Sequence, residues 1–431
     1  MKATKIDRVN ANFEREKLAH PFGFKGGFLS ELWQSAAYMQ SESGNFGLGL
    51  CTQSILWSDG EVFAATSESA GNALMFAVTE FALRLAKGMS FTTPMDLLKQ
   101  VLPETYKYAK KITNRPNLRL TFVLNALVGF DNAAWMLYGR EQQIHDYDEL
   151  IGRDYSKALS NKHDKLCSIP LISYGVPIED VRRLAQSGYF FLKIKIGSDP
   201  DKDGNRDKML EWDKNRLQSI HEAVADLETP FTDSGKIVYY MDANGRYDTK
   251  DRLRQLLDHA QKIGALDRIV LLEEPFPEDM HVPVGDLGVT VAADESAHPD
   301  RHARERIQMG YRAIALKPIA KTMSMSLKIA KLCKKAKVPC FCADLTVNPI
   351  LVDWNKNFAA RLPALPGLKI GAFETNGDQN YKNWDALCGY HPFAGRAWTK
   401  PQNGIFQLDD DFYEKSGGIL LPSEHYLSLV K

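Results

Sequence analysis

The chain has 431 residues and a formal net charge of zero, with 54 basic and 54 acidic side chains. This balance argues against nucleic acid or a membrane surface as a standing partner. Hydrophobic residues make up 44% and charged residues 25%, which is typical of a soluble globular protein. No apolar run is long enough to cross a bilayer, and MKATKIDRVN lacks the apolar core of a signal peptide.

The six cysteines include one close pair, Cys340-Phe341-Cys342. This spacing matches neither a zinc site nor a redox CxxC motif. We therefore expect reduced thiols and a cytoplasmic protein.

The first 140 residues predict an α+β capping domain. Three segments are typical of antiparallel strands, at 4–13, 31–42 and 46–57. Helical patterns follow near 69–88, 93–112 and 117–139. Between two of the strands lies HPFGFKGGF, residues 20–28, which we expect to be a Gly-rich, aromatic loop. An ordinary flexible connection is the alternative for this loop.

A different rhythm begins near residue 166, where short apolar runs alternate with amphipathic stretches such as TKDRLRQLLDHAQKIG. The apolar runs are LCSIPLISYG, YFFLKIKIG, KIVYYMDANG, DRIVLLEEP, LGVTVAADES, YRAIALKP, VPCFCADL and LKIGAFE. Eight such runs predict an α/β fold, a (β/α)8-type barrel over 141–395, with a doubly wound open sheet as the alternative. We expect 198–235, which contains SDPDKDGNRDK, to be a solvated insertion, and 396–431 to return to the cap.

Polar residues collect at the carboxyl ends of these apolar runs, where barrel active sites form. They are Lys193 and Lys195, Asp242 and Asn244, Glu273 and Glu274, Asp294 and Glu295, Lys317, Asp344 and Glu374. Because side chains alternate along a strand, the two lysines of YFFLKIKIG share one face. By the same rule Lys317 shares a face with Ala315 and Ala313, while the branched residues between them point outward.

Each strand end taken alone has a structural explanation. DANG is typical of a turn, EEP and DES of helix starts, and a single lysine at a strand end often reaches solvent. Together, however, three successive strands end in carboxylates and are flanked by strands that end in lysines. Such carboxylates repel one another unless a cation lies between them, and oxygen ligands favour Mg²⁺, or Mn²⁺ in its place. A metal with neighbouring lysines suits removal of a proton α to a carboxylate, through a metal-stabilised ene-diolate.

At this point the sequence resembles the enolase superfamily, in its mandelate racemase/muconate lactonizing enzyme branch. The segment ALVGFDNAAWMLYGRE (126–141) is similar to the helix that joins cap and barrel in that family. AQSGYFFLKIKIG carries a KxK motif, and DAN, EEP and ADES are similar to the three metal-ligand motifs in order.

The resemblance implies a role for each matching residue. The metal ligands would be Asp242, Glu273 and Asp294, with Asn244 supporting them. Lys195 and Lys317 would be acid/base catalysts on opposite faces of the substrate, and Lys193, the third catalytic residue, would bind the substrate carboxylate. Other substrate contacts would come from Glu374, Asp344, and the cap loops near 20–28 and 57–66, with Phe22 and Lys25 as candidates in the first loop.

Two departures from the family pattern narrow the resemblance. VPCFCADL has no histidine on the seventh strand, which favours the lysine–lysine subgroup similar to muconate lactonizing enzyme. AFETNGDQN replaces the DxD motif of dipeptide epimerases, so that activity loses its main support.

The predicted function is a Mg²⁺-dependent isomerase, namely a racemase, epimerase or cycloisomerase acting on a small carboxylate. A lyase, similar to an acid-sugar dehydratase or o-succinylbenzoate synthase, is the alternative at the same site. A non-catalytic barrel is a third hypothesis, disfavoured because buried charges in register are typical of function. We expect a homo-oligomer whose partner is a small-molecule carboxylate substrate.

Overall fold

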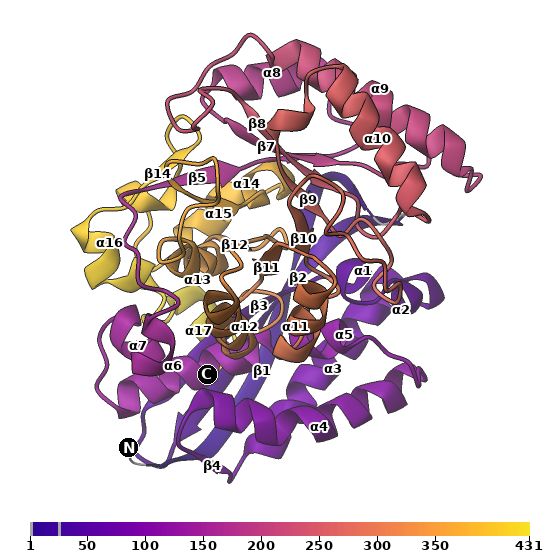
Figure 1. The fold of residues 1–431 in the computed structure, drawn as a ribbon. Coiled ribbons are helices and arrows are strands. Elements are labelled where there is room, and N and C mark those ends of the chain that lie inside the picture. Colours follow the sequence, from indigo (N-terminus) through magenta and orange to yellow (C-terminus); the bar gives the residue numbers. More distant parts are fainter. Residues whose placement is uncertain (1–2, 25–26) are drawn as a thin grey trace.

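The computed structural model describes residues 3–24 and 27–431 as a capping sheet with helices beside a curled sheet of ten strands (Figure 1). The capping sheet is antiparallel, in the order β3-β2-β1-β4. Its strands are β1 (Thr4–Phe24), β2 (Gly27–Ser41), β3 (Phe46–Gln53) and β4 (Ser90–Phe91). The predicted α+β capping domain is therefore confirmed as a fold.

The predicted loop at 20–28 is wrong for most of its length. Strand β1 continues to Phe24 and β2 begins at Gly27, so the two form one long hairpin in which Phe22 pairs with Leu29. Lys25, the candidate substrate contact, lies outside the described residues.

Close packing explains why this hairpin is rich in glycine. A Cβ atom on Gly23 would lie 2.5 Å from the ring of Phe28, its neighbour across the hairpin. A Cβ on Gly27 would lie 2.9 Å from the side chain of Leu56. These glycines permit contact within a hairpin, whereas the sequence pattern suggested the freedom of a loop.

One strand and one helix of the cap differ from their predicted bounds. Strand β3 ends at Gln53 instead of continuing to residue 57, and the helix predicted at 117–139 breaks at Leu127. The helices are α1 (Ile55–Ser58), α2 (Gly60–Ala65), α3 (Glu68–Ala86), α4 (Pro94–Thr113), α5 (Leu120–Ala126) and α6 (Val128–Glu141). The short helix α2 begins where the Asp59 carboxylate accepts hydrogen bonds from two backbone N–H groups, so this side chain caps α2 directly after α1.

The second part is the predicted (β/α)8-type barrel. Its strands are β5 (Lys165–Ile169), β6 (Leu171–Ile172), β7 (Phe191–Lys195), β8 (Val238–Asp242), β9 (Ile269–Glu273), β10 (Val291–Ala293), β11 (Ala313–Leu316), β12 (Cys340–Cys342) and β13 (Gly371–Glu374). All neighbours among them pair in parallel.

The barrel closes through its first strand, which Pro170 divides into β5 and β6. Strand β5 pairs with β13 and β6 pairs with β7, so the two halves join both ends of the curled sheet. Proline has no N–H to donate, yet its carbonyl accepts a hydrogen bond from the N–H of Lys193. The alternative of an open, doubly wound sheet is therefore wrong.

The barrel helices lie outside the strands (Figure 1). They are α8 (Ile178–Gln186), α9 (Arg206–Val224), α10 (Lys250–Lys262), α11 (Asp300–Gln308), α12 (Met323–Ala336) and α13 (Pro349–Ala359). A 3₁₀ turn, η1 (Leu266–Arg268), precedes β9, and residues 274–290 link β9 to β10 by turns and irregular chain.

The solvated insertion predicted at 198–235 is wrong, because half of that stretch is the barrel helix α9. Asn205 caps it by accepting hydrogen bonds from the N–H groups of Asp207 and Lys208. The helix packs between α8 and α10 and buries Leu217 and Ile220. Its polar composition concealed this narrow buried face.

The remaining elements lie before the barrel and after its last strand. They are α7 (Tyr147–Ser156), α14 (Gly377–Asn380), α15 (Trp384–Gly389), η2 (Ala397–Thr399), β14 (Ile405–Gln407), α16 (Asp410–Glu414), η3 (Ser416–Gly418) and α17 (Glu424–Ser428). Strand β14 runs antiparallel to β5. Beyond it, the carbonyls of Leu429 and Val430 accept hydrogen bonds from Asn12 and Asn10 of the cap, so the chain end lies against β1.

The barrel interior carries small residues, and Ala292 pairs in register with Ala313. All six cysteines are free thiols, and Cys388 alone among them is partly exposed. No single helix in the described parts of the chain is long and apolar enough to cross a membrane. The bent pair α5 and α6, at 45° to each other, meets that length and composition only when the two are combined.

Candidate active site

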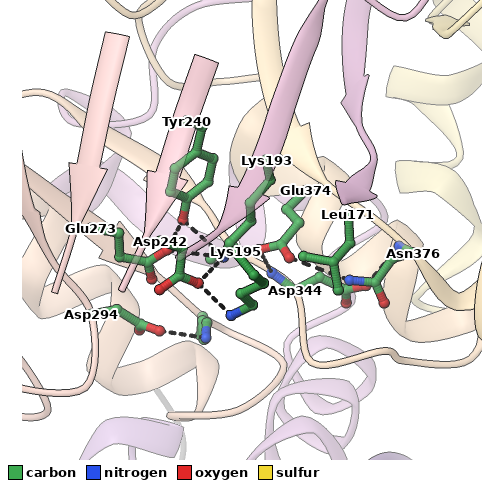
Figure 2. Close-up of polar contacts among 12 residues, drawn as sticks. Leu171, Lys193, Lys195, Tyr240, Asp242, Glu273, Asp294, Asp344, Glu374 and Asn376 are labelled. Atoms are coloured by element: carbon green, nitrogen blue, oxygen red, sulfur yellow. Dashed lines mark hydrogen bonds and ion pairs between the residues drawn. The ribbon is translucent and has the colours of Figure 1, made fainter. Parts of the chain in front are cut away.

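Adjacent barrel strands bring their polar ends to one level at the carboxyl mouth of the barrel (Figure 2). Lys195 of β7 pairs in register with Asp242 of β8, and Asp242 pairs with Glu273 of β9. Register in a parallel sheet aligns side chains of the same parity on one face. The strand ends named in the sequence therefore converge on one cluster of charged side chains.

Lys193 lies at the centre of this cluster and is almost fully buried. Its Nζ is 3.0, 2.9 and 3.0 Å from one oxygen each of Asp242, Glu273 and Glu374. Burial acts to lower the pKa of Lys193, but the three carboxylates outweigh it and hold that pKa well above its ordinary value. Lys193 is thus a fixed positive charge in the floor of the site.

Lys195 lies nearer the mouth and contacts the side chains that end the next strand. Its Nζ is 2.6 Å from Oδ2 of Asp242 and donates to Oδ1 of Asn244 at 2.5 Å. The Asn244 amide in turn donates to Oε1 of Glu295 at 3.0 Å. Asn244 therefore bridges Lys195 to the acidic end of β10, which agrees with a supporting position.

Asp294, at the end of β10, is held by two lysines. Lys317 Nζ lies 2.5 Å from Oδ2, and Lys321 Nζ lies 2.8 Å from Oδ1. Burial would raise the pKa of Asp294, yet these two cations hold it well below its usual range. The pKa of Lys317 is raised in turn, because Asp294 and Glu273 outweigh the effect of burial, which would lower it.

The carboxylates Glu273, Asp294 and Glu295 bring one oxygen each within 4.8 Å of one another. Oε1 of Glu273 has no hydrogen-bond partner in the described residues, although the side chain is fully buried. Burial and the nearby Asp242 raise the pKa of Glu273, as expected for clustered acids. A buried group of carboxylate oxygens, one of which lacks a hydrogen-bond partner in the described residues, fits a hard divalent cation such as Mg²⁺ or Mn²⁺.

Asp242 directs Oδ2 toward the two lysines of β7, whereas its Oδ1 accepts the N–H of Asn244. Glu274, the second acid of the EEP motif, has φ +40° and turns away from the mouth. Its Oε2 accepts the N–H of Asp294 at 2.7 Å and the hydroxyl of Ser296 at 3.0 Å. Burial and Glu295 raise the pKa of Glu274 to about 7.

The ends of β12 and β13 form the opposite wall. The N–H of Asp344 donates to Oε2 of Glu374 at 2.9 Å, and Oδ2 of Asp344 accepts the N–H of Asn376 at 2.9 Å. Burial, with the Glu374 carboxylate beside it, raises the pKa of Asp344 to about 7. Asp344 and Glu374 both line the pocket at the mouth.

The cap covers this mouth with mostly apolar side chains. The cap residues that line the same pocket as the lysines are Phe22, Leu29, Leu32 and Trp57, with one polar residue, Ser54. The ammonium of Lys317 lies 4.7 Å from the centre of the Trp57 ring, within range of a cation–π contact. Phe22 therefore lies at the predicted place, and the pocket belongs to both cap and barrel.

One residue of the site escaped the sequence analysis. Lys321 follows the strand that ends at Lys317, where no periodicity predicts its direction. Tyr240 shares a face with Asp242 by the alternation of the strand, but the sequence could not identify the acceptor of its hydroxyl, which is Glu273. Trp57 begins the predicted cap loop 57–66, yet it lies in α1, and most of that loop is the helix α2.

A second ionic cluster joins the cap to the loops that follow the carboxylate strands. The Arg119 guanidinium donates to both oxygens of Glu278, and His298 Nε2 lies 3.3 Å from Oε2 of Glu278. Burial opposes the charge of Glu278, but these two partners lower its pKa to about 2. The backbone N–H of Arg119 also donates to Asp59, so the segment with Trp57 is tied to the barrel.

Comparison with known proteins gives a family match for the barrel. Residues 178–382 match the family described as enolase C-terminal domain-like, so this part of the chain is similar to that domain. None of the curated proteins compared with the chain matches it.

Solved structures extend the likeness over nearly the whole chain. A mandelate racemase/muconate lactonizing protein from Herpetosiphon aurantiacus is 18% identical with a TM-score of 0.65, over 94% of this chain and 96% of its own. An enolase superfamily member from Listeria innocua is 17% identical with a TM-score of 0.65, over 99% and 98%. A dipeptide epimerase from Cytophaga hutchinsonii, solved with Mg and D-Ala-L-Val, is 18% identical with a TM-score of 0.62, over 88% of both chains. At these identities the likeness shows the fold.

Proposed function

We propose that this chain, whose barrel is similar to the enolase C-terminal domain, removes a proton α to a carboxylate and returns it with a change of configuration or connectivity. The reaction class is a racemase, epimerase or cycloisomerase acting on a small carboxylic acid. The solved dipeptide epimerase with the same fold contains Mg, which supports a metal-dependent reaction of this kind.

One observation carries the proposal: the two candidate proton carriers lie half a turn apart around the barrel. Lys195 ends β7 and Lys317 directly follows β11, and the three strands between them, β8, β9 and β10, carry the acidic cluster. A substrate bound beside that cluster would have one lysine on each face. This is the arrangement that a two-base racemisation requires.

The chain's own residues divide the work. Lys193 would hold the substrate carboxylate through its fixed positive charge, since its pKa is raised well above the ordinary value. Lys195 or Lys317 would take the α-proton at Nζ, and the lysine on the other face would return a proton there. A lysine that takes the α-proton must first be neutral at Nζ, and its carboxylate partner, Asp242 or Asp294, would then need the bound cation to balance its charge.

The predicted metal ligands are Asp242, Glu273 and Asp294. Glu295 lies close enough to join Glu273 and Asp294, whereas Asp242 lies outside that group and contacts Lys193 and Lys195. A bound Mg²⁺ would supply Lewis-acid stabilisation of the charge that develops on the substrate carboxylate. The cap would exclude water, because Trp57 and Leu32 cover the mouth while remaining almost fully buried themselves.

A lyase is the second candidate, and Asp344 favours it. With a pKa of about 7, this carboxyl holds a proton in part of the molecules at neutral pH. A protonated acid in the pocket wall could donate to a departing β-hydroxyl after the α-proton is removed. Release of a keto acid would identify this reaction, whereas an isomerase gives exchange without loss of water.

The test is α-proton exchange in D₂O with Mg²⁺ and resolved enantiomers of a carboxylate series, followed by NMR. Lys195→Ala and Lys317→Ala should each lose exchange of one enantiomer by about 10²- to 10⁴-fold while retaining exchange of the other. Lys335→Ala, an exposed lysine of α12, is the matched control and should retain both. If exchange survives unchanged for both enantiomers in either active-site variant, the two-lysine assignment is wrong.

A further inference from the structure

We infer that the substrate carries a short apolar substituent on the side that faces the cap, and that Trp57 selects it. The ligand class is thus a monocarboxylate with a short alkyl substituent, as opposed to a polyhydroxy acid. This inference rests on the proposed function, because it assumes that the carboxylate binds beside Lys193.

The wall of the pocket above the charged cluster is apolar. Leu29 and Leu32 from β2, with Trp57 from α1, are each at most 3% exposed. Leu171 of β6 and Leu345, which follows β12, continue this surface from the barrel. Apolar side chains from two domains therefore converge where the substrate's substituent must lie, since the lysines and acids occupy the opposite floor.

The free space of the whole pocket, its charged floor included, is about 40 Å³. A few water-sized groups fill a volume of this size, so only a short substituent fits beyond the carboxylate.

The polar groups that follow β12 and β13 in this wall are already paired with one another. Thr346 donates its hydroxyl to Oδ1 of Asn376 at 2.7 Å, and the Asn376 amide donates to Oε1 of Glu374 at 3.3 Å. Oδ2 of Asp344 accepts the Asn376 N–H. A hydroxylated substituent would have to break these bonds or leave its own hydroxyl unpaired, and either outcome weakens binding.

Trp57 lies both in the apolar wall and beside a candidate proton carrier. Its ring lies beside the Lys317 ammonium, so a group packed on the indole lies next to a candidate proton carrier. The segment is held rigidly, because Ser58 donates to Oδ1 of Asn125 and the Ser58 carbonyl accepts the hydroxyl of Thr121. Trp57 is therefore a preformed wall and not a side chain that must move to admit a substrate.

A matched ligand pair isolates the substituent from the carboxylate. Pentanoate and 4-hydroxybutanoate have the same length and the same α-carbon, and differ by a terminal methyl against a hydroxyl. Ligand-observed NMR titration of the Mg²⁺-loaded protein gives both dissociation constants. We expect pentanoate to bind at least tenfold more tightly, because the hydroxyl loses water and gains no partner. Across acetate, propanoate and butanoate, each methylene should tighten binding by about fourfold.

Variants at Trp57 assign the effect to one residue. Trp57→Phe should keep the preference for pentanoate, and Trp57→Gln should reduce it to threefold or less. Trp212→Gln is the matched control, because Trp212 lies on α9 and does not line the pocket. Circular dichroism of each variant establishes that it is folded.

Three results would overturn the inference: equal or tighter binding of 4-hydroxybutanoate, binding of neither acid, or an unchanged preference in folded Trp57→Gln. These outcomes differ from failure of the proposed function, which is the loss of α-proton exchange with every acid. A protein that prefers pentanoate and exchanges no α-proton keeps the apolar site and loses the catalytic proposal. A protein that exchanges α-protons but favours hydroxylated acids keeps the catalytic proposal and loses the apolar site.

Discussion

Lys321 offers a direct test of how the charged cluster is held together. Its Nζ is fully buried and lies 2.5 Å from the carbonyl oxygen and 2.8 Å from Oδ1 of Asp294. Replacing Lys321 with methionine keeps most of the side-chain volume and removes the charge and the hydrogen bonds. The variant leaves Asp294 with a single cationic partner, Lys317, on its other oxygen.

The size of the effect follows from these contacts. Breaking a buried ion pair costs about 3–5 kcal/mol, because one charge remains in a site with little water. Since Lys317 still neutralises part of the Asp294 charge, we expect the lower end, about 3 kcal/mol. At about 2.1 cal/mol/K of unfolding entropy per residue, a 431-residue chain would lose about 3 °C in Tm.

Thermal unfolding in EDTA and in excess Mg²⁺ measures this loss. In EDTA, Lys321→Met should unfold about 3 °C below the natural protein, and Lys335→Met, an exposed lysine on α12, should not differ from it. Mg²⁺ should stabilise the Lys321 variant more than the natural protein, because a cation bound at Asp294 replaces the missing charge. An unchanged Tm in EDTA, or equal stabilisation of both proteins by Mg²⁺, would refute the assigned role of Lys321.

Two further changes test other parts of the site. Glu278 has a pKa of about 2, below the ordinary value of about 4.3, so its ionised form stabilises the folded state fully above that ordinary value and less as the pH falls toward 2. Lowering the pH from 6 to 3 should therefore reduce the free energy of unfolding, measured with urea, more in the natural protein than in Glu278→Gln. An equal pH dependence of the two proteins contradicts the stabilising role of the Arg119–Glu278 ion pair. Glu273→Gln should weaken Mg²⁺ binding at least tenfold by calorimetry with an unchanged circular dichroism spectrum, and unchanged affinity would remove Glu273 from the metal site.

The barrel could be predicted from the sequence because the rules that identify its strands depend only on neighbouring residues. A strand such as Val238–Asp242 is a short apolar run that ends in polar residues, and parity along the run gives the direction of each side chain. The same rule placed Lys193 and Lys195 on one face. It could not identify their partners, since Lys193 binds Glu374, a residue 181 positions away.

The failures of prediction have a common physical cause, which is packing between distant segments. Gly23 and Gly27 indicated a loop, but they are small because Phe28 and Leu56 press on the hairpin. The polar stretch 198–235 indicated an insertion, but α9 needs only a narrow apolar face to cover the barrel. The local composition of the sequence predicts neither the packing of the hairpin nor the packing of α9 on the barrel.

The charged cluster is better explained by chemistry than by stability. Lys193 is buried among three carboxylates, and a well-packed apolar group in its place would often be as stable or more stable. Four lysines meet these acids at one end of the barrel, where the cap shields them from water. A purely structural ion-pair network has no need to place two of those lysines half a turn apart on β7 and β11. A reaction that moves a proton across two faces of one carbon does need that separation, so the positions of Lys195 and Lys317 favour catalysis over a structural role.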